Sequence, residues 1–230
     1  MTATLPPLTE ANDPLCLTPT QAAALLFDAP WRRFGVIGDS LSLGTGDPAP
    51  GYGHLGWSAR FEAILRQIRP DLAALNTARV GARTPEVLAG QFDRMRAFEP
   101  DLLHLNSGAN DIVRRDPDFD EIEADLRRMY EMGVRTGARL TVFTLGRAYV
   151  VPVFADWHDR LRRLNDITRR LAGRYDAVLT DFWDHEFNDR PDLLSADRIH
   201  FATSGQAVIA SEYVKQLAHR LGSVRGAPSV

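Results

Sequence analysis

With 230 residues, the chain is long enough for one domain with a sizeable core, and 44% hydrophobic with 25% charged residues is typical of a globular protein. A formal net charge of −3 gives no reason to expect nucleic acid or an anionic membrane as a partner. The single cysteine, Cys16, excludes an intrachain disulfide. No apolar stretch approaches the length of a membrane span, and residues 1–14 lack the pattern of a signal peptide. The basic residues are nearly all arginine, which is typical of a genome of high GC content, and we expect a cytoplasmic bacterial protein.

Short apolar runs alternate with helical patterns along the chain. Runs typical of strands buried on both faces lie at 34–38, 72–76, 102–106, 139–145 and 177–181. Helices are predicted at 20–28, 56–68, 85–98, 119–136, 156–175 and 203–221. This alternation predicts an α/β fold with three layers, α/β/α, around a five-stranded parallel sheet.

The domain organisation is simple, because the chain has no repeat, no low-complexity segment and no dividing linker. We expect an N-terminal extension at 1–30, one domain at 31–221 and a C-terminal tail at 222–230. The outermost parts, about 1–18 and 222–230, are predicted to be disordered.

Five candidate site residues follow predicted strands or precede the last helix. Ser40 follows the first strand, Gly81 lies in the loop after the second, and Asn110 follows the third. Asp197 and His200 lie in the connection to the last helix. Because ligands bind outside the carboxyl ends of parallel strands, these residues are predicted to meet at one edge of the sheet.

Together these residues have the groups that acyl transfer to a serine requires. The Ser40 hydroxyl needs a base, and a neutral imidazole, such as the side chain of His200, can act as one. Asp197, three residues earlier, can hold the Nδ1–H of that imidazole. The backbone N–H groups of Ser40 and Gly81, with the side-chain amide of Asn110, can stabilise the oxyanion. We expect this chemistry to need no metal and no cofactor.

Each candidate residue also has a structural explanation. Ser40 fits a helix N-cap, His200 a brace for the last helix, Asn110 a turn, and Gly81 a backbone with positive φ. Their joint occurrence, in this order and at these strand ends, favours catalysis.

Other polar residues are predicted to be structural. Asp39 and Asp111 are expected to brace loops through backbone N–H groups, and His104 is expected to be a core histidine. Residues 181–186 contain three acids and a histidine but lack the spacing of a metal site. Gly44-Thr45-Gly46 lacks the lysine of a phosphate-binding loop, and the chain has no Gly-x-Ser-x-Gly elbow.

The chain resembles the SGNH hydrolases, also called the GDSL family of esterases and lipases. The resemblance covers about residues 33–219, and it implies a flavodoxin-like strand order, 2-1-3-4-5, and the site roles given above. The motifs that carry it are Gly38-Asp39-Ser40-Leu41-Ser42, Asn76-Thr77-Ala78-Arg79-Val80-Gly81, Gly108-Ala109-Asn110-Asp111 and Asp197-Arg198-Ile199-His200.

The sequence therefore predicts a serine esterase with a small-molecule ester as its partner. Short-chain carboxylic esters, or O-acetyl groups on sugars or metabolites, are the expected substrates, since no long apolar lid suited to lipids is visible. An acyltransferase that uses the same triad with an alcohol acceptor is an alternative, and a non-catalytic binding domain is a weaker one. The oligomeric state and the role of residues 1–30 are left open.

Overall fold

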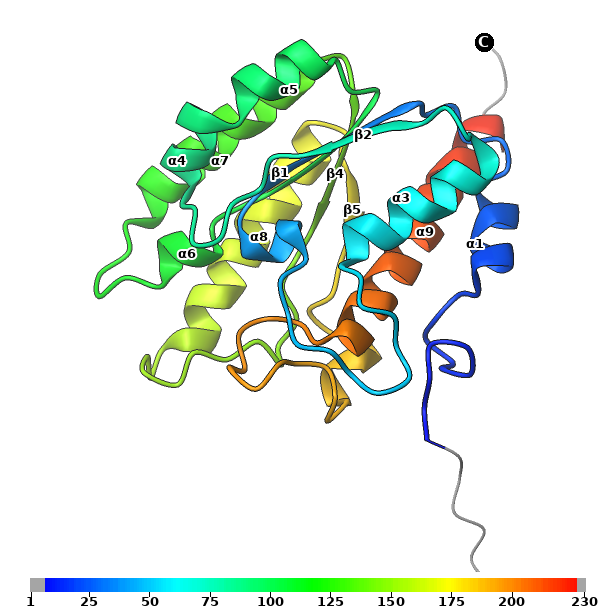
Figure 1. The fold of residues 1–230 in the computed structure, drawn as a ribbon. Coiled ribbons are helices and arrows are strands. Elements are labelled where there is room, and N and C mark those ends of the chain that lie inside the picture. The colour runs from blue at the N-terminus through cyan, green and yellow to red at the C-terminus, as the bar shows by residue number, and fades with distance from the viewer. Residues whose placement is uncertain (1–6, 227–230) are drawn as a thin grey trace, which may run out of the picture.

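The structure is a computed structural model that describes residues 7–226. At its centre lies a sheet of β1 (Arg33–Gly38), β2 (Ala73–Asn76), β3 (Leu102–Asn106), β4 (Arg139–Phe143) and β5 (Val178–Thr180). All neighbouring pairs are parallel, and the order is β2-β1-β3-β4-β5 (Figure 1). The predicted α/β fold and the strand order implied by the family resemblance are both confirmed. The carboxyl ends of the strands therefore share one edge, which we call the catalytic edge.

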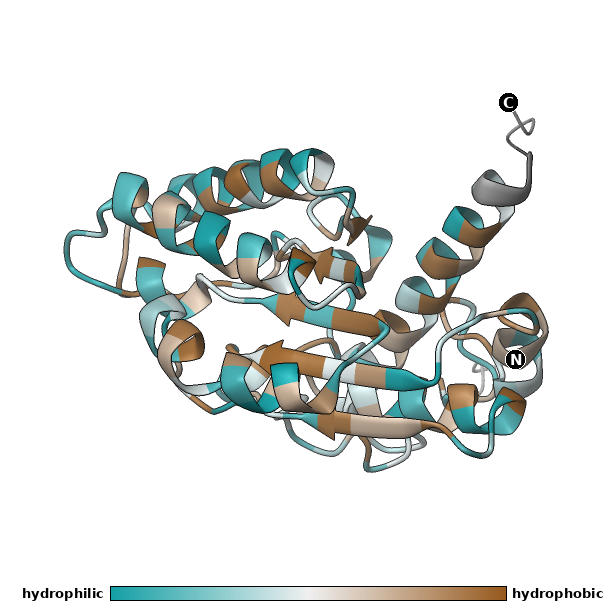
Figure 2. Ribbon diagram, turned by 90° about the horizontal axis from the view of Figure 1, so that it is seen from above, coloured by the Kyte–Doolittle hydropathy of each residue, from teal (hydrophilic) through white to brown (hydrophobic). Residues whose placement is uncertain are grey.

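Helices cover both faces of this sheet. They are α1 (Pro19–Leu25), α3 (Trp57–Ile68), α4 (Thr84–Gly90), α5 (Phe92–Phe98), α7 (Phe119–Val134), α8 (Trp157–Arg174) and α9 (Thr203–Gly226). On one face α1, α3 and α9 contact one another; on the other, α4 contacts α5 and α7, and α7 contacts α8 (Figure 1). Short helices at the catalytic edge are α2 (Ser40–Leu43), α6 (Ala109–Ile112) and the 3₁₀ helix η1 (Glu186–Asp189). Figure 2 shows largely apolar strands between helices that carry both polar and apolar residues.

Two helices differ from the sequence-based expectation. The helix expected over 85–98 is broken between α4 and α5, where the Gln91 side chain turns inward and bonds the backbone of Gly38. The last helix continues past Leu221 to Gly226, so the prediction of a disordered tail at 222–230 is wrong for residues 222–226. Helical periodicity shows which face of a helix is apolar. It does not show where a helix ends, or that the Gln91 side chain forms hydrogen bonds with a distant backbone.

The buried centre under α3 and α9 is aromatic. Trp57 and Tyr213 pack against the ring of His104, with centroids 4.6 and 5.7 Å from it. His104 is fully buried in β3, as expected for a core residue, and burial lowers its pKa to about 3. Its imidazole is therefore neutral and serves packing.

The prediction of disorder is wrong for residues 7–18. Glu10 N donates to Gly51 O at 3.0 Å, and Asp13 is only 4% exposed. Thr18 caps α1 in a capping box with Gln21. The segment is rich in proline and has no apolar periodicity, and this pattern predicts disorder. Polar contacts with distant residues order its backbone instead. Residues 1–6 and 227–230 of the expected tails lie outside the described residues.

In the part of the chain that the structure describes, no helix is both long and apolar enough to cross a membrane.

Candidate active site

Ser40 is the first residue of α2, directly beyond the end of β1, and is 7% exposed. The backbone turns sharply at Gly38, whose φ is +141°, and a Cβ there would lie 2.2 Å from Asn106 O. Glycine is therefore required at this position. Asp39 caps α2 by accepting the Leu41 N–H at 2.9 Å. These contacts place the Ser40 side chain at the catalytic edge.

His200 and Asp197 lie in the loop before α9 and reach Ser40 from across the edge. His200 Nε2 lies 2.9 Å from Ser40 Oγ, and His200 Nδ1 lies 2.6 Å from Asp197 Oδ2. The other carboxylate oxygen of Asp197 accepts the backbone N–H groups of Ile199 and His200 at 2.9 and 3.0 Å. Burial opposes ionisation of Asp197, but hydrogen bonds from the His200 side chain and these backbone groups outweigh it and lower its pKa.

Gly81 lies in the loop after β2, and Asn110 lies in the short helix α6 after β3, both at the catalytic edge. Asn110 Nδ2 donates to Ala82 O at 3.0 Å and is 3.5 Å from Asp39 Oδ2, so its amide joins the loop of Gly81 to the cap of α2. Gly81 has a φ of +74°, and nothing lies within 4 Å of a Cβ built there, so backbone conformation rather than space favours glycine. Within residues 7–226, the backbone N–H groups of Ser40 and Gly81 have no hydrogen-bond acceptor.

Asp111 braces the two loops, as the sequence predicts. Its carboxylate accepts the Thr84 backbone N–H at 3.0 Å and the Thr84 hydroxyl at 2.9 Å. Thr84 Oγ1 in turn lies 2.9 Å from Ser107 Oγ, beyond the end of β3. Asp111 therefore fixes the start of α4 against α6 and makes no contact with His200 in the described structure.

Two buried polar residues around Ser40 have features that the sequence analysis missed. Gln91 Nε2 donates to Gly38 O at 2.8 Å, and Gln91 Oε1 accepts the Gly38 N–H at 2.9 Å. Asp39 is fully buried, and burial raises its pKa to about 7 despite hydrogen bonds from the backbone of Leu41 and Ser42. The available signal for Gln91 was a polar residue on the inward face of a predicted helix.

The acidic and histidine residues around 181–186 have local partners. Asp181 pairs with Arg169 at 2.7 Å, and the Phe187 N–H donates to His185 Nδ1 at 3.1 Å. Among residues 7–226, no group of three His, Cys, Asp or Glu side chains is placed to hold a metal ion.

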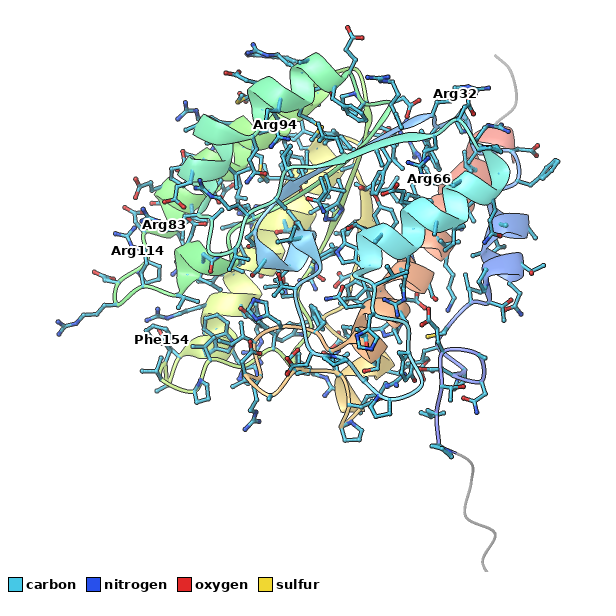
Figure 3. All side chains as sticks on the ribbon, viewed as in Figure 1. Arg32, Arg66, Arg83, Arg94, Arg114 and Phe154 are labelled. Carbon is cyan, nitrogen blue, oxygen red and sulfur yellow. The ribbon has the colours of Figure 1, made fainter. Side chains whose placement is uncertain are left out.

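The aromatic residues of the catalytic-edge loops are largely packed into the protein. Tyr52, Tyr149 and Phe187 are at most 6% exposed. Phe154 stacks on Trp157 and lies under the Arg160 guanidinium, 4.4 Å from ring centroid to Cζ. Figure 3 shows Phe154 toward the catalytic edge and Arg32 at the opposite edge, where β1 begins.

The parallel sheet, its strand order and the contact between serine, histidine and aspartate at its carboxyl edge define an SGNH-type hydrolase. Residues 36–208 match the model of the GDSL-like lipase/acylhydrolase family. The chain belongs to this family of carboxylic ester hydrolases, as the sequence motifs predict.

Individual relatives agree with this assignment. The chain is 27% identical over 203 residues to the GDSL lipase Rv0518 of Mycobacterium tuberculosis. The matched region covers 84% of this chain and 85% of that lipase. The esterase EstA of Pseudoalteromonas has a similar fold, with a TM-score of 0.66 at 18% identity over 83% of this chain and 99% of EstA. The acetylxylan esterase Axe2 of Geobacillus stearothermophilus gives a TM-score of 0.65 at 19% identity over 81% of this chain and 94% of Axe2.

Proposed function

We propose that this protein is a serine esterase that hydrolyses small or short-chain carboxylic esters through an acyl-enzyme on Ser40. One observation carries the proposal: Ser40 Oγ, the His200 imidazole and the Asp197 carboxylate form one continuous chain of contacts, at 2.9 and 2.6 Å. Both distances lie in the range that direct proton transfer and tautomer control require.

In the acylation step, His200 Nε2 takes the Ser40 proton while Oγ forms a bond to the ester carbonyl carbon. Asp197 accepts the Nδ1–H and stabilises the imidazolium that results. When the tetrahedral intermediate collapses, the bond to the leaving oxygen breaks and His200 returns its proton to that oxygen. The products of this step are an alcohol and acylated Ser40.

In the second step, His200 takes a proton from water, and the hydroxide attacks the acyl carbon. Collapse of the second intermediate breaks the bond to Ser40 Oγ, which recovers the proton from His200. A free carboxylic acid leaves, and the enzyme returns to its starting state. The cycle uses only groups of the chain and water.

The negative charge of both intermediates needs donors that are not already engaged. The backbone N–H groups of Ser40 and Gly81, which find no acceptor among residues 7–226, meet this need. Asn110 Nδ2 carries two hydrogens: Ala82 O accepts one at 3.0 Å, and the other has only the long 3.5 Å contact to Asp39 Oδ2, so it can turn to a better acceptor. We assign these three groups to the oxyanion hole, where preorganised donors act on the transition state.

Within this class, O-acetyl groups on sugars or small metabolites are the substrates that we favour. The fold neighbours support this assignment, because one of them is an acetylxylan esterase. The packing of Tyr52, Tyr149 and Phe187 into the protein also leaves little apolar surface from these side chains for a long acyl chain.

The test combines covalent labelling with product analysis. A fluorophosphonate probe is expected to modify Ser40, identified by peptide mass spectrometry, and to abolish hydrolysis of p-nitrophenyl acetate. A panel of short-chain, long-chain and sugar O-acetyl esters, each with and without an acceptor alcohol, then identifies the reaction. Transesterified product in excess of free acid would make the enzyme an acyltransferase. Absence of both labelling and turnover would leave a non-catalytic binding domain.

A further inference from the structure

The N-terminal segment 7–18 lies against the catalytic edge, outside the part of the chain that matches the family model. Figure 1 shows this dark blue segment beside the loop that joins α2 to α3. Its most buried charge is Asp13, whose side chain has no exposed surface. A buried carboxylate is costly unless it is paired, so its partners show what the segment holds.

Asp13 joins three separate segments. Tyr52, from the loop between α2 and α3, donates its hydroxyl to Asp13 Oδ2 at 2.7 Å. Arg190, from the loop after η1, forms an ion pair with the same oxygen and donates to the Tyr52 hydroxyl at 3.0 Å. The Leu15 N–H donates to Asp13 Oδ1 at 2.9 Å. Burial opposes ionisation of Asp13, but Arg190 and Tyr52 outweigh it and lower its pKa.

The loop that Arg190 begins carries Asp197 and His200. Its two arms are paired, because Ser195 N donates to His200 O at 2.8 Å and Ala202 N donates to Leu193 O at 3.0 Å. The first arm begins at Arg190, which the ion pair with Asp13 holds in place, and the second arm continues into α9.

The loop that carries Tyr52 holds the same arms from a second direction. Asp47 N donates to Ser195 Oγ at 2.8 Å, and Asp47 Oδ2 accepts the Ala196 N–H at 2.9 Å. Asp47 O also accepts the Thr203 N–H at 2.9 Å. Both supports of the His200 loop therefore converge on Asp13, through Arg190 and through the Tyr52 loop.

We propose that Asp13 is a positioning residue for His200, and that the N-terminal segment is a functional part of the active site. The inference rests on the proposed function of His200. The His200 side chain is 18% exposed and that of Asp197 is 46% exposed, so packing around them is incomplete. The pair depends on the anchoring of its loop, and Asp13 is the buried charge at that anchor.

The experiment compares Asp13→Asn and Asp13→Ala with a matched control, Glu10→Gln. Glu10 lies in the same segment, pairs with the buried Arg60 at 2.8 Å, and accepts the Gly53 N–H of the Tyr52 loop at 2.9 Å. Glu10 forms no hydrogen bond or ion pair with the described loop from Arg190 to His200. The control therefore weakens the hold of the segment on the Tyr52 loop but leaves intact the ion pair between Asp13 and Arg190, where the His200 loop begins.

Two readouts are expected to change in the Asp13 variants and not in the control. For p-nitrophenyl acetate, kcat falls roughly 10- to 100-fold with KM within about twofold, because a small displacement of the base mainly affects the chemical step. Amide hydrogen exchange of Ser195 and Ala202 becomes at least about tenfold faster, because the paired arms open. Asp13→Glu, which keeps the charge, is expected to restore part of both.

The exchange readout does not depend on catalysis, so the two proposals fail separately. If the wild-type protein has no esterase activity, the proposed function is wrong. Amide hydrogen exchange still shows in that case whether Asp13 anchors the His200 loop. If Asp13→Ala does not fold, Tyr52→Phe replaces it; loss of one hydroxyl is expected to lower kcat about threefold and to speed exchange at the same two amides. Variants of Asp13 or Tyr52 that match Glu10→Gln in kcat and in exchange would overturn the inference.

Discussion

The two halves of the candidate site are held in different ways. On the nucleophile side, Ser40 begins α2 directly beyond a central strand, and its neighbour Asp39 is fully buried. On the other side, Asp197 and His200 lie in a loop, and the Asp197 side chain is 46% exposed. The sheet fixes the serine, whereas hydrogen bonds from distant segments fix its base.

Because of this difference, we expect substitutions on the two sides of the site to affect stability and catalysis to different degrees. Changes around Ser40 disturb buried polar contacts and are expected to affect folding as well as activity. Changes in the loop of His200 are expected to lower activity while leaving the core intact.

The largest effect is expected for removal of the nucleophile or the base. Ser40→Ala and His200→Ala should each lower kcat by roughly 10⁴- to 10⁶-fold, because each removes one of the two partners in the proton transfer that activates the nucleophile. Rates of p-nitrophenyl acetate hydrolysis, with circular dichroism to verify folding, measure this. Since the two groups act as one unit, the double variant should be little worse than either single one. Strictly additive losses would argue against a shared proton transfer.

Asp197→Asn should come next, with kcat lowered roughly 10³- to 10⁴-fold and KM nearly unchanged. The amide favours the wrong imidazole tautomer, so that an N–H rather than a lone pair faces Ser40. Asp111→Asn is the matched control, because Asp111 bonds Thr84 and should lose thermal stability more than activity. The reverse result, a crippled Asp111→Asn and a near-normal Asp197→Asn, would mean that the acid is misassigned.

Asn110→Ala should lower kcat by roughly 10²- to 10³-fold, about 2.7–4 kcal/mol, with a smaller change in KM. Its amide acts on charge that develops in the transition state. Because Asn110 also donates to Ala82 O at 3.0 Å, a modest loss in melting temperature should accompany the loss of rate. Loss of stability with an unchanged kcat would restrict Asn110 to shaping the turn.

The smallest effect on the catalytic rate is expected for Asp39, whose titration changes the stability of the protein instead. Burial raises the pKa of the Asp39 carboxyl from its usual 3.8 to about 7. Between these two pH values the carboxyl is protonated in the folded protein and ionised in the unfolded chain. This contribution to stability is complete below pH 3.8 and is lost as pH rises through about 7, by up to about 4 kcal/mol.

Asp39→Asn tests this contribution, since asparagine keeps the cap but has no charge to bury. Urea unfolding at pH 5 and pH 8 should show a larger loss of stability for wild type than for Asp39→Asn. Equal losses in the two proteins would mean that Asp39 does not titrate in this interval.

Much of this architecture could be predicted from the sequence. Five buried runs separated by helices indicate the fold class. Because the strands are parallel, their carboxyl ends share one edge, and Ser40, Gly81 and Asn110, which follow these ends, lie there. His200 and Asp197 could be placed there because a short motif joins them to the start of the last helix. Their catalytic roles, the division into 1–30, 31–221 and 222–230, and the cytoplasmic location stay predictions.

Contacts between residues far apart in the chain could not be predicted. Gln91 bonds Gly38 across 53 positions, and Arg190 meets Asp13 across 177. Hydrophobic periodicity carries no information on such pairs, because each depends on one polar side chain in a three-dimensional setting. The error over residues 7–18 has this cause: their order comes from buried polar contacts rather than from an apolar pattern.

The paired bonds between Gln91 and Gly38 have a chemical consequence for position 91. One side chain presents a donor and an acceptor side by side, as an adjacent strand would, and thereby completes the hydrogen bonding of the backbone two residues before Ser40. Glutamate has nearly the same shape but, when ionised, offers only acceptors. It would place negative oxygen against the carbonyl oxygen of Gly38, so the change smallest in volume would be among the most disruptive. At position 91, the order of donor and acceptor matters more than size.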